Sequence, residues 1–205
     1  SVKSTSGAIA ITDASVAQQA PIATAATVAV TADQGSITMA DTSTSTTDTG
    51  ALTYEAATDV AIGQLTSTSA TITVTATAGA ITDISSTEAA NVQTANTAIL
   101  VAANGIGAAG AADIDTALDN LQASNTSSGD IFIAESDSVI LDGVTTTAGN
   151  GTIVVLTAAG DLTVNGAVQA HGSGDIRFEA VTHGGISNVT LNAEVSSGSG
   201  AISVS

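Results

Sequence analysis

The 205-residue chain contains no cysteine, so it forms no disulfide bond and offers no thiol for catalysis. It also lacks tryptophan, and its aromatic side chains are limited to Tyr54, Phe132 and Phe178. Aromatic rings normally supply much of the buried area of a large single core, so a core of that kind is excluded. The only proline, Pro21, leaves extended segments almost uninterrupted. These absences favour a narrow core filled with small and β-branched side chains.

Basic residues and long apolar runs are also scarce. Lys3 and Arg177 stand against 19 acidic residues, which gives a formal net charge of −17. This negative charge repels nucleic acid and anionic lipid surfaces, so we expect no nucleic-acid partner. No apolar run reaches the roughly 18 residues of a membrane-spanning helix, so we expect no membrane insertion. A hydrophobic content of 43% and a mean hydropathy of +0.39 exclude disorder for most of the chain.

One short pattern returns along the chain and indicates a repeat architecture. It consists of valine, a few small polar residues, glycine, a small or acidic residue, and then alternating apolar residues. Its copies, some with a stretched spacer, lie at 2–11, 30–39, 74–81, 144–151, 168–174 and 195–204. Because the pattern occurs near both ends of the sequence, we expect the chain to be a segment of a longer tandem array.

The residues around these glycines predict short β-strands, because apolar and small polar side chains alternate with period two. Glycine-anchored strands are predicted at 7–11, 35–39, 50–54, 129–133, 151–155, 160–164, 174–178 and 200–204. Further strands of the same character are predicted at 27–30, 60–62, 71–74, 139–141 and 189–191.

Strands this short are unstable alone and must stack on neighbours. Copies of the pattern recur at intervals of roughly 22–28 residues, the length of one turn of a β-solenoid. We therefore predict an all-β fold, a right-handed parallel β-helix of about eight turns, in a single domain over residues 1–205. Six isoleucines that follow anchoring glycines are expected to face inward: Ile9, Ile37, Ile81, Ile153, Ile176 and Ile202.

The segment 88–125 breaks this pattern because it is rich in alanine, with interspersed Asp and Asn. Asp113 is a suitable helix cap. The apolar residues that follow it are spaced four and three apart, at Ile114, Leu118 and Leu121. We predict a loop with a partly helical excursion near 103–125, which either binds a partner or covers apolar solenoid surface. We favour the cover.

Parts of the sequence resemble known repeat proteins. Residues 160–168 read Gly-Asp-Leu-Thr-Val-Asn-Gly-Ala-Val and resemble the haemagglutinin repeats of filamentous-haemagglutinin-like exoproteins. Three further stretches resemble a segment of giant bacterial β-strand-repeat surface proteins. They read Asn-Gly-Ile-Gly at 104–107, Ile-Asp-Thr-Ala-Leu-Asp-Asn-Leu-Gln-Ala at 114–123 and Ser-Gly-Asp-Ile-Phe-Ile-Ala-Glu at 128–135. The resemblance implies a parallel β-helix, secretion from a bacterium, and adhesive or structural work at the cell surface. It brings no catalytic residues.

Catalytic patterns are scarce. His171 and His183, the only histidines, each sit beside glycine in an expected turn. Parallel β-helices also include polysaccharide lyases and glycosidases, and a glycosidase needs two carboxylates facing one groove. Asp130, Asp161 and Asp175 each follow a strand-initiating glycine and are candidates for such an edge. A lyase needs a base, and only two basic residues exist, so we predict a protein without enzymatic activity.

Calcium is the more plausible chemistry, since hard cations prefer several oxygen ligands. Two local carboxylate clusters are candidates, and they comprise Asp113, Asp115 and Asp119, and Glu135, Asp137 and Asp142. Neither cluster matches an EF-hand loop, and the alternative is a solvated acidic surface that limits lateral aggregation, which we prefer. No other cofactor is expected.

The sequence thus predicts a non-catalytic, extracellular, structural or adhesive β-solenoid within a long surface fibre or adhesin stalk. We expect self-association end to end or side by side, and contacts with a host-cell or matrix surface. One alternative is a carbohydrate-active β-helix enzyme, a polysaccharide lyase or glycosidase. Another is a self-assembling filament or surface-layer scaffold.

Overall fold

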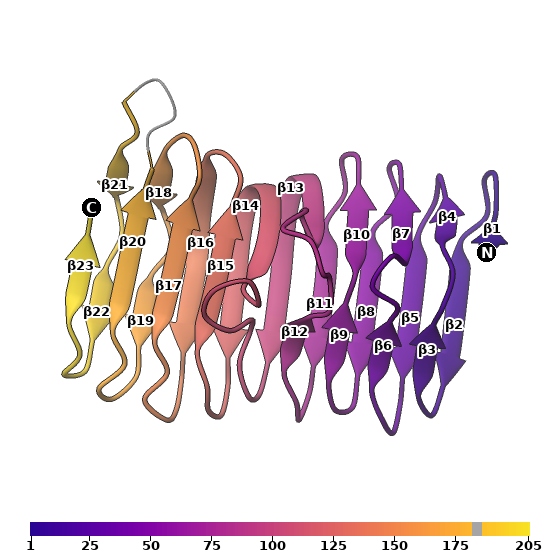
Figure 1. Ribbon diagram of the computed structural model, residues 1–205, viewed down its shortest axis with the longest axis horizontal. Coiled ribbons are helices and arrows are strands. Elements are labelled where there is room, and N and C mark those ends of the chain that lie inside the picture. Colours follow the sequence, from indigo (N-terminus) through magenta and orange to yellow (C-terminus); the bar gives the residue numbers. More distant parts are fainter. Residues whose placement is uncertain (182–185) are drawn as a thin grey trace.

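The computed structural model describes residues 1–181 and 186–205, and every regular element within them is a β-strand. The chain forms a stack of parallel coils, a β-solenoid of about nine turns (Figure 1). Strands β15 (Ile131–Glu135), β17 (Ile153–Thr157) and β20 (Ile176–Ala180) rise along the near face of Figure 1, and the stack advances from right to left. Because the chain returns along the far face, the winding is right-handed, and the predicted parallel β-helix is confirmed. Among the described residues there is no helix that could serve as a membrane span.

The first four coils share a cross-section of three strands, which stack into three parallel ladders. Ladder A contains β1 (Val2–Lys3), β4 (Ile22–Thr24), β7 (Thr44–Thr47) and β10 (Gln64–Ser67). Ladder B contains β2 (Ile9–Asp13), β5 (Val28–Ala32), β8 (Leu52–Ala56) and β11 (Ile72–Ala76). Ladder C contains β3 (Val16–Gln18), β6 (Ile37–Met39), β9 (Val60–Ile62) and β12 (Ile81–Asp83).

The middle coils have longer strands, and the corners differ from there onward. Two long strands each continue ladder A directly into ladder B, and they are β13 (Val92–Ala102) and β14 (Ile114–Asn125). Strands β15, β17, β20 and β23 (Ile202–Val204) then form one ladder. The opposite side holds β16 (Val139–Thr146), which pairs with β18 (Leu162–Val164) and β19 (Val168–Ala170), and these pair with β21 (Val189–Leu191) and β22 (Val195–Ser197).

The corner between ladders C and A disappears at β15. Ile131 bridges to Ile106, which continues ladder C, whereas Ile133 pairs with Ile114 of ladder A. The run Ile-Phe-Ile-Ala-Glu begins with three strong strand formers and contains no Gly, Pro, Asn or Asp that would favour a turn, so the strand passes straight through the former corner. Ladder B bends instead within β16, where Gly143 adopts a φ of +128° that favours glycine. The cross-section therefore changes halfway along the stack.

The core is a continuous column of stacked aliphatic side chains. All six isoleucines expected to face inward are on the inner side, and five are buried, namely Ile9, Ile37, Ile81, Ile153 and Ile176. Ile202 is 46% exposed because no coil stacks beyond β23 in this structure. The isoleucines do not form one ladder, since Ile9 lies in ladder B and Ile37 in ladder C. The valine–glycine pattern thus marks a strand–corner–strand unit that serves at more than one corner.

The prediction of a partly helical excursion near 103–125 is wrong. Residues 114–125 form strand β14, and its buried residues alternate on either side of one irregularity. Leu118 and Leu121 both point inward because the exposed Asp119 and its neighbour interrupt the alternation between them. Because of this single interruption, the buried apolar residues Ile114, Leu118 and Leu121 of a strand are spaced four and three apart, as in a helix. The real excursions are two loops, at 84–91 and 107–113.

Candidate functional site

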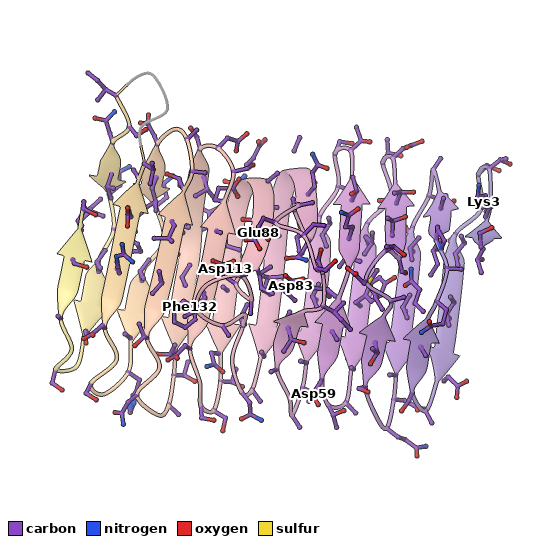
Figure 2. The ribbon with its side chains drawn as sticks, viewed as in Figure 1. Lys3, Asp59, Asp83, Glu88, Asp113 and Phe132 are labelled. Carbon is purple, nitrogen blue, oxygen red and sulfur yellow. The ribbon has the colours of Figure 1, made fainter. Side chains whose placement is uncertain are left out.

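The two loops leave the solenoid where ladders C and A meet, immediately before the corner disappears. The first loop is held against an earlier coil, because the backbone N–H and the hydroxyl of Ser86 each donate a 2.8 Å hydrogen bond to the carboxylate of Asp41. These bonds lower the pKa of the Asp41 carboxyl. The second loop closes as a tight hairpin, in which Ala108 donates a 2.7 Å hydrogen bond to Ala112. Both loops lie over the near face of the stack (Figures 1 and 2).

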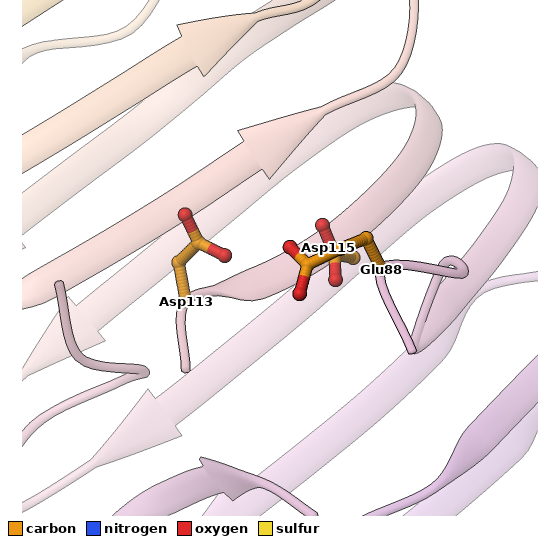
Figure 3. A group of neighbouring side chains, drawn as sticks. All are labelled: Glu88, Asp113 and Asp115. Atoms are coloured by element: carbon orange, nitrogen blue, oxygen red, sulfur yellow. The ribbon is translucent and has the colours of Figure 1, made fainter. Parts of the chain in front are cut away.

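Three carboxylates meet between these loops. Glu88 comes from the first loop, Asp113 from the end of the second, and Asp115 from the start of β14 (Figure 3). An oxygen from each lies within 4.8 Å of the others. We call these three residues the acidic wall. Within the described residues they are the one group of acidic or histidine side chains close enough to share a metal ion.

Burial and mutual repulsion raise the pKa values in this wall. Burial, together with the negative charges of Asp113, Glu88 and Asp83, raises the pKa of Asp115 to about 7. The pKa of Asp113 is raised by the same causes, with burial first. Asp83 stays nearby because its carboxylate accepts a 2.7 Å hydrogen bond from the buried side-chain amide of Asn91. The wall therefore concentrates negative charge that no described basic side chain neutralises.

A fourth carboxylate, Glu135, faces inward beneath the wall and is 1% exposed. The hydroxyl of Thr116 donates a 2.8 Å hydrogen bond to it, and the backbone N–H groups of Leu118, Ser136 and Asp137 also donate to it. Burial nevertheless raises the pKa of Glu135 to about 7. With its oxygens committed to the corner that ends β15, Glu135 is a structural residue.

Beside the wall lies an outward-facing apolar surface on β15 and β17. Phe132 lies next to Val154, and Ala134 lies next to Leu156, all on the outer side of their strands and half-buried. We call these four residues the outer floor. Asp115 is the sheet neighbour of Ala134, so the wall adjoins the floor directly. A hollow of about 230 Å³ lies between them, lined by residues that include Glu88, Asp115, Ala134 and Ala158.

The other calcium candidates do not join this site. Asp119 is exposed in the irregular part of β14, and Asp137 lies in the turn after β15, where its N–H donates to Glu135. Asp142 lies at the bend of β16, and Asn192 lies at the same corner two coils further along the chain. Of the six predicted ligands, the structure therefore places only Asp113 and Asp115 in the acidic wall, while the buried Glu135 borders the hollow beside Asp115.

The carboxylates expected along a catalytic edge are used in stacking. Asp130, Asp161 and Asp175 each accept a hydrogen bond of 2.7–2.8 Å from a backbone N–H one coil further on. Asp130 and Asp175 share a corner, whereas Asp161 lies between β17 and β18. The ring Nδ1 of His171 is 2.7 Å from the carbonyl oxygen of Gly149. His183 lies outside the described residues.

Sequence reasoning missed Glu88 and the outer floor. Glu88 is far from Asp113 along the chain, and no local pattern links them, because only the stacking of successive coils brings the two loops together. The floor did leave a signal, since Ile-Phe-Ile-Ala and Ile-Val-Val-Leu are apolar at both alternating positions. Such runs are typical of strands that are covered on both faces.

No family model matches the chain, and no match is found among curated proteins or solved structures. The resemblance to filamentous-haemagglutinin-like and β-strand-repeat surface proteins therefore stays a prediction that depends on the sequence motifs.

Proposed function

We propose that the chain is a non-catalytic extracellular β-solenoid with a structural or adhesive role, as part of a surface fibre or adhesin stalk. The observation that carries the proposal is the unbroken parallel pairing from β1 to β23, which makes a rod whose length grows with each coil. Its outward strand positions are mostly Thr, Ala, Ser and Gln, and such a surface suits many weak contacts.

The geometry gives little support to a carbohydrate-active enzyme. Two of the three aromatic side chains, Tyr54 and Phe178, are fully buried and unable to stack on sugar rings. The carboxylates of Asp130, Asp161 and Asp175 are engaged by backbone N–H groups. These features favour a rod over a polysaccharide lyase or glycosidase.

The proposal is tested by adhesion and turnover assays on the same preparation. Beads coated with the chain are expected to retain host cells, matrix-coated surfaces or further copies of the chain, while a panel of acidic and neutral polysaccharides stays uncleaved. Cleavage that disappears in a variant carrying D130N, D161N and D175N would establish the enzyme instead. Beads that retain none of the three surfaces would contradict the adhesive and self-assembling roles together.

We also propose that copies of the rod associate, with side-by-side contacts favoured over end-to-end joining. The first coils have three short or medium strands with a corner between ladders C and A, whereas the last coils run straight through that position. A copy stacked end to end would have to pair β21–β23 with β1–β3, whose corners differ. Side-by-side contacts need no such match.

We further propose that calcium binds at the acidic wall. Glu88, Asp113 and Asp115 place carboxylate oxygens close together, and a divalent cation would relieve the repulsion that raises the pKa of Asp115. Calorimetric titration with calcium is expected to show one site that disappears in E88Q/D113N/D115N and persists in the control D119N/D142N. Absence of binding heat, with an unchanged melting temperature in calcium, would remove this proposal.

A further inference from the structure

Strands β15 and β17 are apolar on both faces and lie beside the acidic wall, whereas the similarly apolar end of β13, with Ile99 and Val101 outward, lies in ladder B. Inward, Ile131 and Ile153 belong to the core. Outward, Phe132 and Val154 continue the row in which the earlier coils carry Thr38, Ala61 and Thr82. Ala134 and Leu156 continue the row of Asp115. A sheet face that meets water normally alternates apolar and polar side chains, and a strand that is apolar on both sides is typical of a covered one. The floor therefore has the composition of a surface that a partner covers.

The borders of the floor define what kind of partner fits. On one side the floor adjoins the acidic wall through Asp115, the sheet neighbour of Ala134. On the other side it meets Arg177 and Glu179, which form an ion pair and leave that border close to neutral. The partner thus needs apolar side chains for the floor and positive charge for one edge.

A second copy of the chain does not supply that charge. Lysine and arginine occur once each in the chain. Lys3 lies in the first coil, and Arg177 is already paired with Glu179. With a net charge of −17, another copy would add repulsion at the wall. Charge complementarity therefore selects a different, basic molecule.

We propose that the outer floor and the acidic wall together dock a peptide segment of another protein that alternates apolar and basic side chains. Apolar side chains two residues apart in an extended segment are about 7 Å apart, which matches the outward residues of one floor strand. The hollow of about 230 Å³ between wall and floor would admit one long basic side chain beside Glu88 and Asp115. It is smaller than the roughly 300 Å³ of the smallest drug-sized ligand sites. The inference rests on the proposed adhesive function and names the chemistry of its partner.

The test uses a fluorescent synthetic peptide of alternating leucine and lysine as the probe, with binding followed by anisotropy in the presence of a chelator. A peptide of alternating serine and lysine controls for charge alone. A peptide of alternating leucine and glutamate keeps the apolar side chains and reverses the charge. We expect the leucine–lysine peptide to bind at least about tenfold more tightly than either control. Equal binding of the serine–lysine peptide would reduce the effect to net charge and overturn the proposal.

Two variants locate the binding surface. F132T/V154T/L156T places polar β-branched threonine on the outer side, as in Thr38 and Thr82 of earlier coils, and is expected to weaken binding about tenfold. E88Q/D113N/D115N is expected to weaken it by a similar factor. The matched control I99T/V101T removes half-buried apolar side chains from the outer side of β13, in ladder B, and should leave the affinity unchanged.

Equal losses in the floor variant and in I99T/V101T, or wild-type affinity in the floor variant, would overturn the docking site. If the triple floor variant fails to fold, as judged by its melting transition, L156T alone provides the same comparison. Polysaccharide turnover by the wild-type chain would contradict the proposed function but not the peptide result. The two conclusions can thus fail separately.

Discussion

At the scale of single residues, the corners set how closely one coil approaches the next. Gly129, Gly151, Gly174 and Gly200 stack at one corner, one from each successive coil. A Cβ on Gly151 would lie 2.0 Å from the carbonyl oxygen of Gly129, and one on Gly174 would lie 2.0 Å from that of Gly151. These glycines are required because backbone from the adjacent coil occupies the space of a side chain.

Substitution of Gly151 tests this stacking. We expect Gly151→Ala to lower the free energy of unfolding by about 2 kcal/mol or more, because the neighbouring backbone has to move. Gly7→Ala is the matched control, since the nearest atom to its Cβ would be the movable hydroxyl of Ser4 at 3.1 Å, and we expect a change within about 0.5 kcal/mol. Urea denaturation of both variants measures the difference. Equal stability of the two would show that the corner is not closely packed.

The acidic groups at the site predict how stability depends on pH. The folded pKa values of Asp115 and Glu135 are raised to about 7, from ordinary values of 3.8 and 4.5, so both groups hold a proton more tightly in the folded chain. Their stabilising contribution is complete below the unfolded values and is lost as pH rises towards 7. We expect the free energy of unfolding to fall by about 2 kcal/mol between pH 4.5 and pH 8, after allowance for solvent near Asp115.

Denaturation in calcium-free buffer across this pH range measures the slope. D115N should flatten it, because the amide has no proton to release. D119N removes one carboxylate outside the wall and serves as the control for net charge. A slope of opposite sign, or a D115N slope as steep as that of the wild type, would contradict the assignment.

At the scale of elements, β14 shows why a strand resembled a helix. Its inward residues include Thr116, Leu118, Leu121 and Ala123, and the step from 118 to 121 departs from period two. Strand β13 carries its own irregularity opposite, where the register shifts between Thr94 and Thr97. The two irregularities let long strands turn from ladder A into ladder B without a corner.

A pair of substitutions in β14 separates strand from helix. Leu121 is buried and the next residue, Gln122, is exposed on the opposite face. We expect Leu121→Asp to cost about 3 kcal/mol or more and to unfold the middle coils, because it places an unpaired charge in the core. Gln122→Asp should change stability by about 0.5 kcal/mol or less. Thermal unfolding of both variants measures the difference in stability. Similar losses of stability in the two variants would contradict the strand assignment.

At the scale of the whole molecule, negative charge works against assembly. Nineteen acidic residues face two basic ones, and Arg177 is already paired with Glu179. At an ionic strength of 0.1 M, salt largely screens the repulsion between exposed charges that lie more than about 10 Å apart. The rod should therefore become both more stable and more associated as salt is added.

This expectation is measured by calorimetry and sedimentation velocity from low to high sodium chloride. We expect the melting temperature to rise and larger species to appear as salt increases. An equivalent series in sucrose, which does not screen charge, controls for general effects of cosolutes on folding. A strictly monomeric chain at high concentration and high salt would contradict the proposed association.

Sequence alone determined the local features of this protein. Alternation with period two identified which residues point inward, and the valine–glycine pattern identified corners, so the β-solenoid and the burial of residues such as Ile153 and Ile176 were predictable. Composition likewise determined the narrow aliphatic core and the negative surface. These features depend on neighbours in the chain, which a sequence displays directly.

Only the tertiary structure decided where the corners fall and what they bring together. The alternation cannot reveal that β15 runs straight through a former corner, because inward and outward positions look the same on either side of a bend. The meeting of Glu88 with Asp113 and Asp115 likewise depends on the register between coils, which the lengths of the intervening loops determine. The acidic wall beside the outer floor exists because contacts between stacked coils, and not between neighbours in the chain, place them side by side.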